Sequence, residues 1–108
     1  MKGITYMTVK TNISDDKKHL SIIVEEKFDF SQHQNFRDAY SKHTNNGTLF
    51  RVDLSKTDYM DSSALGMILL LKDHAESING QIEICKPNEV ITKILEIAQF
   101  HRLMKIEQ

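Results

Sequence analysis

The chain has 108 residues, of which 40% are hydrophobic and 27% charged, and its 14 lysine and arginine residues against 15 aspartate and glutamate residues give a formal net charge of -1. This size predicts one small globular domain that folds without metal or disulfide support, and basic residues spread among acidic ones are atypical of nucleic-acid binding. The single Cys85 cannot form an internal disulfide, and the sequence has neither a signal-peptide h-region nor a run of about 20 apolar residues, so we expect a cytosolic protein that binds no membrane. We also expect it to bind no nucleic acid and to be monomeric when free.

The first part of the chain is predicted to form a β-hairpin followed by a helix. Residues 5–10 and 20–26 have strand-like, β-branched composition and flank a polar segment, residues 11–18. Ser31, with a glutamine three residues later, matches a capping box. Apolar residues then recur at helical spacing until residues 45–47 stop the pattern, so we expect the first helix to lie between these points.

The second part of the chain alternates strands with helices. Residues 49–54 are predicted to form a strand, and a second helix follows from about residue 62 to residue 78. Residues 81–85 form another short strand, after which Asn88 is the expected N-cap of a third helix over residues 90–98.

A final strand is possible over residues 104–107. The element order is then β-β-α-β-α-β-α-β, with no repeat or linker that would divide residues 1–108 into two domains. This order predicts the α/β class: a single domain with a mixed sheet of four to five strands and helices packed against it.

The most informative stretch is residues 52–67, which runs from a strand through a loop into a helix. Ligands and partners commonly bind at the carboxyl ends of strands in open α/β sheets. Asp61, Ser62 and Ser63 lie at the start of the helix, and any one of them could be its N-cap. Capping alone is therefore one interpretation of these three residues.

The predicted second helix has an apolar arc for the sheet and further leucines around its opposite side. The arc that faces the sheet contains Ala64, Met67, Ile68, Leu71, Ala75 and Ile78. The opposite side contains Ser62, Gly66, Leu69 and Asp73, with Leu65 and Leu70 at its margins. Apolar surface beside an exposed hydroxyl indicates a protein-docking site. The alternative is that a neighbouring helix covers these leucines.

Two segments carry a resemblance to a known family: Asp53-Leu54-Ser55, and Tyr59-Met60-Asp61-Ser62-Ser63-Ala64-Leu65-Gly66. They resemble the signature of bacterial anti-sigma factor antagonists with a STAS domain, in which an aspartate ends a strand and Met-Asp-Ser-Ser-Gly-Leu-Gly opens a helix after a short loop. The resemblance extends to Phe28-Asp29-Phe30, in the place of the family's Gly-x-Leu/Phe-Asp. It covers most of the chain and implies the STAS fold.

The sequence departs from the family pattern at two positions. Ala64 replaces the usual glycine, and Lys27 occupies the usual glycine position before Phe28-Asp29. Because alanine is a better helix former than glycine, we expect Ala64 to leave the helix intact while slightly crowding a close backbone approach.

The resemblance implies an anti-sigma factor antagonist that regulates transcription by partner switching. The dephosphorylated form binds an anti-sigma factor or a GHKL-type serine kinase, and phosphorylation of Ser62 releases it; Ser63 is a secondary candidate, and a metal-dependent serine phosphatase restores binding. The helix amides and dipole are expected to tolerate the phosphate. The residues expected to contact the partner are Asp29, Asp53, Asp61, Ser62, Ser63, Leu65, Gly66 and Leu69.

Other classes of function have less support in the sequence, and we expect no catalytic residue, no metal and no cofactor. Neither Gly-x-Ser-x-Gly nor a glycine-rich phosphate loop is present, and the five histidines lack metal-ligand spacing. Cys85 falls in a strand that we expect to be buried, where thiols are usually inert. Asp53 could indicate a phosphoaspartate receiver, but residues 5–10 offer no carboxylates for its acidic pair. A STAS domain that serves as an unphosphorylated regulatory or structural subunit stays an alternative.

Overall fold

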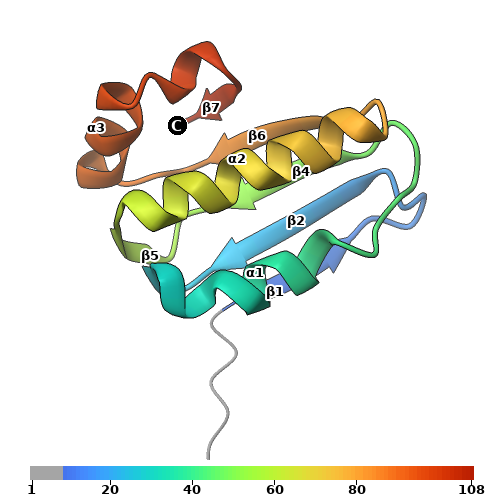
Figure 1. Cartoon of the computed structure of the whole chain (residues 1–108), viewed down its shortest axis with the longest axis horizontal. Coiled ribbons are helices and arrows are strands. Elements are labelled where there is room, and N and C mark those ends of the chain that lie inside the picture. Colours follow the sequence, from blue (N-terminus) through green and yellow to red (C-terminus); the bar gives the residue numbers. More distant parts are fainter. Residues whose placement is uncertain (1–8) are drawn as a thin grey trace, which may run out of the picture.

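The computed structural model describes residues 9–108, which form a mixed sheet with helices on one face (Figure 1). The five strands lie in the order β1-β2-β4-β6-β7, and β1 is antiparallel to β2 while the other pairs are parallel. Their bounds are β1 (Val9–Ile13), β2 (His19–Val24), β4 (Leu49–Asp53), β6 (Gln81–Cys85) and β7 (Lys105–Glu107). The antiparallel hairpin and the predicted α/β class are both confirmed.

The helices connect the parallel strands, as crossovers between such strands require. Their bounds are α1 (His33–Tyr40), α2 (Ser62–Ser77) and α3 (Glu89–Ile97), with short 3-10 helices η1 (Phe30–Gln32) and η2 (Phe100–Arg102). Figure 1 shows α1 and α2 side by side across one face of the sheet. A second, two-stranded parallel sheet pairs β3 (Glu26–Phe28) with β5 (Thr57–Met60), at the end where α2 begins.

The core lies between the sheet and the helices because each strand alternates its side chains. In β4, Phe50 and Val52 are fully buried, whereas the intervening Arg51 is only half-buried. The α2 arc predicted to face the sheet packs against this layer: Ala64, Met67, Ile68, Leu71 and Ala75 are buried, and Ile78 is half-buried. That prediction is confirmed, and Ala64 lies inside an intact helix as expected.

The predicted bounds of the hairpin are wrong in part. The first strand is β1 (Val9–Ile13) instead of residues 5–10, of which residues 5–8 lie outside the described part of the chain. Thr11 and Asn12, expected in the turn, pair with β2. Their polar side chains fit a strand because β1 is at the edge of the sheet, where both are exposed.

The first helix also differs from its prediction at both ends. Ser31 is not its N-cap, because its amide and hydroxyl both donate to the Asp29 carboxylate, which caps η1 instead. The helix ends at Tyr40, well before residues 45–47. His43 has left the helix, and its ring nitrogen lies 3.1 Å from the Thr48 hydroxyl.

Two short strands were missed because the sequence does not show their long-range pairing. The strand predicted over residues 20–26 ends at Val24, and Glu26, with a φ of 64°, begins the separate β3. Residues 57–60 were expected to be loop, but they form β5, whose Thr57 hydroxyl donates to the Val24 carbonyl at 2.7 Å. β5 ends at Met60, and α2 begins two residues later at Ser62.

The C-terminal end of α2 depends on Gly80. A Cβ at this position would lie 2.3 Å from the Thr48 carbonyl oxygen, whereas a Cβ at Gly66 meets no atom within 4 Å. We predict that Gly80→Ala lowers the free energy of unfolding by about 1–3 kcal/mol through overpacking. The matched Gly66→Ala should raise it by up to about 1 kcal/mol, because alanine favours a helix. Urea denaturation of both variants checks this, and equal effects would contradict it.

Candidate functional site

The carboxylate of Asp61 organises the first turn of α2. Its Oδ1 atom accepts hydrogen bonds from the Ser63 amide at 3.0 Å, the Ala64 amide at 3.4 Å and the Ser63 hydroxyl at 2.6 Å. The Asp61 backbone is extended, as an N-cap requires. The structure thus identifies Asp61 as the N-cap among the three residues that the sequence left open.

The two serines after Asp61 have different environments. Ser63 is half-buried and its hydroxyl is bound to Asp61, whereas Ser62 is exposed. We expected the free amides at the start of the helix to donate hydrogen bonds to a phosphate on Ser62. The amides of Ser63 and Ala64 are not free to do so, because they already donate to Asp61. A phosphate on Ser62 would be tolerated because the side chain faces solvent.

Asp29 lies at the same end of the small sheet as Asp61. Phe28 at the end of β3 pairs with Met60 at the end of β5, so the two aspartates follow paired residues. Asp29 Oδ1 accepts from the Ser31 amide at 3.0 Å and the Ser31 hydroxyl at 2.5 Å, the same arrangement as at Asp61. The hydroxyl hydrogen bond holds the pKa of the exposed Asp29 carboxyl below its ordinary value.

Asp53 lies in the large sheet, whereas Asp29 and Asp61 follow the strands of the small one. It ends β4 in the large sheet, where it pairs in register with Cys85, and its Oδ1 accepts from the Ser55 amide at 2.9 Å. The structure therefore does not group Asp53 with Asp29 and Asp61 on the small sheet. A contact of Asp53 with a partner stays a prediction.

The outward side of α2 exposes two leucines among polar residues. Leu69 is 39% and Leu70 is 50% exposed, whereas Leu65 is partly buried against the core. Gly66 adds an exposed position without a side chain next to Ser62 on this side. Within residues 9–108, Leu70 lines a small hollow with Phe36 and Tyr40 of α1 and is therefore covered in part by a neighbouring helix. The alternative predicted for the leucines thus holds in part for Leu70 and does not hold for the exposed Leu69.

Two exposed aromatic residues at this end were not among the predicted site residues. Phe30 is 68% exposed and stacks on the His33 ring at a centroid distance of 5.0 Å, and Tyr59 is 51% exposed. Tyr59 precedes the buried Met60 at the end of β5, whereas Phe30 lies two residues after the buried Phe28, outside β3 and at the start of η1. Alternation along a strand could have found Tyr59 if residues 57–60 had been known to form one, but it could not have found Phe30, which lies in η1.

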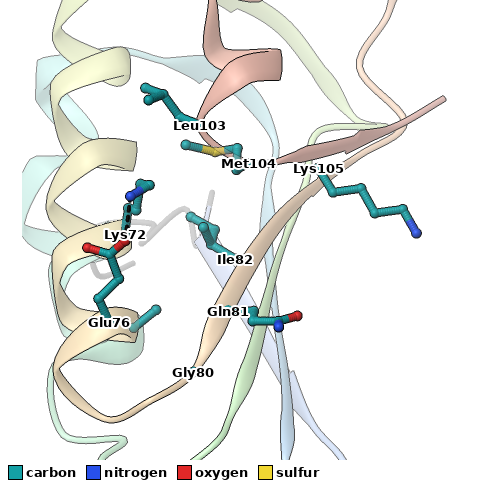
Figure 2. Close-up of a pocket in the computed structure, with 9 residues that line it drawn as sticks. Lys72, Glu76, Gly80, Gln81, Ile82, Leu103, Met104 and Lys105 are labelled. Carbon is teal, nitrogen blue, oxygen red and sulfur yellow. Dashed lines mark hydrogen bonds and ion pairs between the residues drawn. The ribbon is translucent and has the colours of Figure 1, made fainter.

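A shallow groove of about 270 Å³ lies beside the C-terminal half of α2, away from Ser62 (Figure 2). Ala75, Ile82 and Met104 contribute apolar lining. In Figure 2, Lys72 turns along the helix toward Glu76, with which it forms an ion pair, and Lys105 points away from the groove. Lys72 follows Ser62 by ten residues, about 15 Å along a helix, so the groove is separate from the site.

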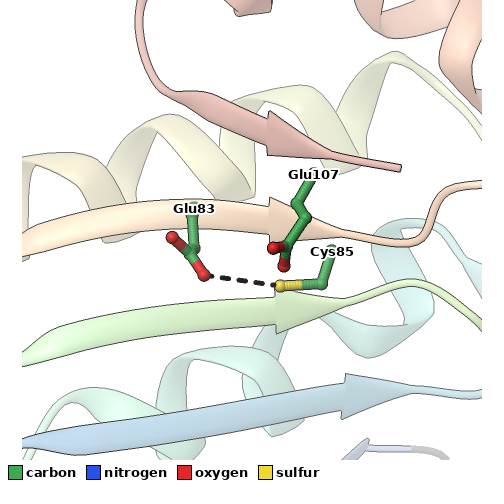
Figure 3. Close-up of side chains that lie close together, drawn as sticks. All are labelled: Glu83, Cys85 and Glu107. Carbon is green, nitrogen blue, oxygen red and sulfur yellow. Dashed lines mark hydrogen bonds between the residues drawn. The ribbon is translucent and has the colours of Figure 1, made fainter.

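One group of possible metal ligands occurs within residues 9–108: Glu83, Cys85 and Glu107 (Figure 3). Both carboxylates already pair with Arg51, whose Nε lies 2.8 Å from Glu83 and whose Nη2 lies 3.0 Å from Glu107. Burial raises the pKa of the Cys85 thiol, although Arg51 acts in the opposite direction. A guanidinium among these carboxylates and a protonated thiol both disfavour a cation, so the group does not fit a metal site.

The sequence model of the family described as "Mlab, STAS domain" matches residues 11–106. A STAS-domain containing protein of Pseudomonas aeruginosa (strain UCBPP-PA14) is 43% identical over 100 residues, which cover 93% of this chain and 99% of the relative. No helix in residues 9–108 is both long and apolar enough to cross a membrane.

Solved structures with low sequence identity share the fold. A candidate anti-sigma factor antagonist from Thermotoga maritima has a TM-score of 0.77 at 19% identity, with 93% of this chain and 86% of that chain covered. The phosphorylated form of the Bacillus cell fate determinant SpoIIAA has a TM-score of 0.69 at 15% identity, with 93% and 91% covered. An anti-sigma factor antagonist from Mycobacterium paratuberculosis has a TM-score of 0.71 at 10% identity, with 95% and 88% covered.

The Asp61 cap can be tested by comparing two substitutions. Asp61→Ala removes the acceptor of all three hydrogen bonds and should lower the free energy of unfolding by about 1–2 kcal/mol, whereas Asp61→Asn keeps an acceptor and should cost less than half of that. Urea denaturation measures both values. Equal losses would show that the carboxamide cannot cap α2 and would contradict this description of its first turn.

The Asp29 carboxyl gives a prediction about pH. Because its pKa in the folded state is below the ordinary value of 3.8, its contribution to stability is present above that pH and is lost as the pH falls through the folded pKa. The main cause of the lowered Asp29 pKa is the hydrogen bond from the Ser31 hydroxyl, so Ser31→Ala should raise this pKa toward 3.8. An NMR titration of the Asp29 side chain checks this, and an unchanged pKa would contradict it.

Proposed function

Because the chain belongs to the STAS domain family, we propose that it is an anti-sigma factor antagonist that works by partner switching. In this proposal the unphosphorylated chain binds an anti-sigma factor or a serine kinase of the GHKL type. Phosphorylation of Ser62 releases the partner, and a metal-dependent serine phosphatase restores binding. The output is regulation of transcription in the bacterial cytoplasm.

The observation that carries this proposal is the placement of Ser62. Its hydroxyl is exposed at the first position of a 16-residue helix, directly after the capping Asp61. On the same outward side of the helix, Gly66 is open and Leu69 is 39% exposed. A modifiable hydroxyl next to exposed apolar surface supports a docking face that a covalent change can switch.

The switching step follows from electrostatics at the docking face. Phosphorylation adds about -1.5 to -2 charges at Ser62. A partner that covers Leu69 and Gly66 would have to desolvate this charge, at a cost of roughly 2–5 kcal/mol when no group of the partner compensates it. This cost corresponds to a roughly 30- to several-thousand-fold loss of affinity. Release therefore requires no rearrangement of the fold.

The proposal assigns a binding role to the chain and no catalytic step. ATP belongs to the kinase, and the hydroxyl of Ser62 is the acceptor of the phosphoryl group. The known alternative within the family is a STAS domain that acts as an unphosphorylated regulatory or structural subunit. That alternative uses the same apolar side of α2, so only the response to phosphorylation separates the two.

We predict that Ser62→Ala binds its partner constitutively and Ser62→Asp binds it weakly. Tagged variants, added to lysates of the native cell, should differ in the amount of anti-sigma factor or serine kinase retained, as measured by quantitative mass spectrometry. Equal recovery by the two variants would favour the unphosphorylated subunit.

Ser77→Asp is the matched control for charge. Ser77 is an exposed serine in the last turn of the same helix, so its substitution adds an equal charge away from the proposed docking face. It should retain partner like the unmodified chain. If Ser77→Asp released the partner as fully as Ser62→Asp, the effect would come from helix stability or net charge, and the assignment of Ser62 would be wrong.

A further inference from the structure

We infer that Asp61 determines which of the two adjacent serines can carry the phosphate: it commits Ser63 to the helix cap and leaves Ser62 as the position where a phosphate is compatible with an intact first turn of α2. The inference rests on the proposed function, because it concerns the modification that the function requires. Asp61 is thus a specificity-determining residue, because it sets how stable the fold is when one serine or the other is phosphorylated.

The first step of the argument is the hydrogen bond of Ser63. Its hydroxyl is 2.6 Å from Asp61 Oδ1, the same atom that accepts from the Ser63 amide at 3.0 Å. The donor must be the hydroxyl, since an ionised carboxylate only accepts hydrogen bonds. Ser63 is also half-buried, so its side chain has less access to solvent than that of Ser62.

A second Asp-x-Ser segment in the same chain has this geometry. At Asp29, Oδ1 accepts from both the amide and the hydroxyl of Ser31, and the intervening Phe30 is 68% exposed. The arrangement therefore binds the third residue of the segment and directs the middle residue to solvent. Ser62 occupies the middle position in the segment that begins α2.

The third step compares the phosphorylated products. Phosphoryl transfer from ATP breaks the bond between the γ-phosphorus and the bridging oxygen, forms a bond to the serine Oγ, and releases ADP and the hydroxyl proton. Phosphorylation of Ser63 removes the hydroxyl hydrogen that is donated to Asp61 and places a dianion against the Asp61 carboxylate. Ser62 supplies none of the three donors to Asp61, so a phosphate there removes none of these hydrogen bonds.

The test measures the stability of chains with phosphoserine encoded at position 62 or at position 63, without kinase or partner. Urea denaturation at pH 7.5, where the phosphate is largely dianionic, gives the folding equilibrium constant of each. We expect phosphoserine 62 to change this constant little and phosphoserine 63 to lower it by about tenfold or more. Asn keeps the cap without the charge. In an Asp61→Asn background, phosphoserine 63 should therefore lower the folding equilibrium constant less than it does with Asp61, whereas the effect of phosphoserine 62 should stay the same.

Equal losses at the two positions, or no recovery with Asp61→Asn, would overturn the inference. If the chain phosphorylated at position 63 does not fold, Ser63→Asp and Ser62→Asp are compared in the same way with and without Asp61→Asn, and the same two results decide. Ser63→Ala shows how much of the loss comes from the missing hydroxyl alone. Since these measurements contain no kinase and no partner, their failure is distinct from a failure of partner switching.

Discussion

The hydrogen bonds of one carboxylate, that of Asp61, fix the point at which α2 begins and the direction of its first side chains. Asp61 follows β5, and β5 is held in place by pairing with β3, so the start of the helix is coupled to the sheet. The rest of α2 then buries its arc from Ala64 to Ala75 against the large sheet. The residues of α2 outside this buried arc form its outward side, which contains Ser62, Gly66 and Leu69.

This constraint connects the fold with the proposed switch. The rotation of α2 about its axis is set by the arc from Ala64 to Ala75 that it buries, and Ser62 lies outside this arc. The Ser62 hydroxyl is therefore exposed on the same side of α2 as Leu69, about two turns away, and an added charge meets any surface that covers both residues. The net charge of -1 makes the local change large relative to the whole chain, since one phosphate adds about -1.5 to -2.

Patterns local in the sequence predicted much of the fold and of the site, because periodicity reports burial directly. The buried arc of α2, the N-cap Asn88 and the strand Gln81–Cys85 agree with the structure. The pairing of β3 with β5 was not predictable, since it depends on contacts between segments about 30 residues apart. The roles of Ser31 and Ser63 were missed for a related reason: each serine donates to an aspartate two residues earlier, and composition alone cannot distinguish a cap from a donor to a cap.

The central claim is that a phosphate on Ser62 by itself removes the partner. The most direct measurement is the affinity of the purified partner for the unmodified chain and for the chain with phosphoserine encoded at position 62, by isothermal titration calorimetry. We expect a dissociation constant at least roughly 30-fold higher for the phosphorylated chain, the factor that corresponds to about 2 kcal/mol. Equal dissociation constants would contradict it.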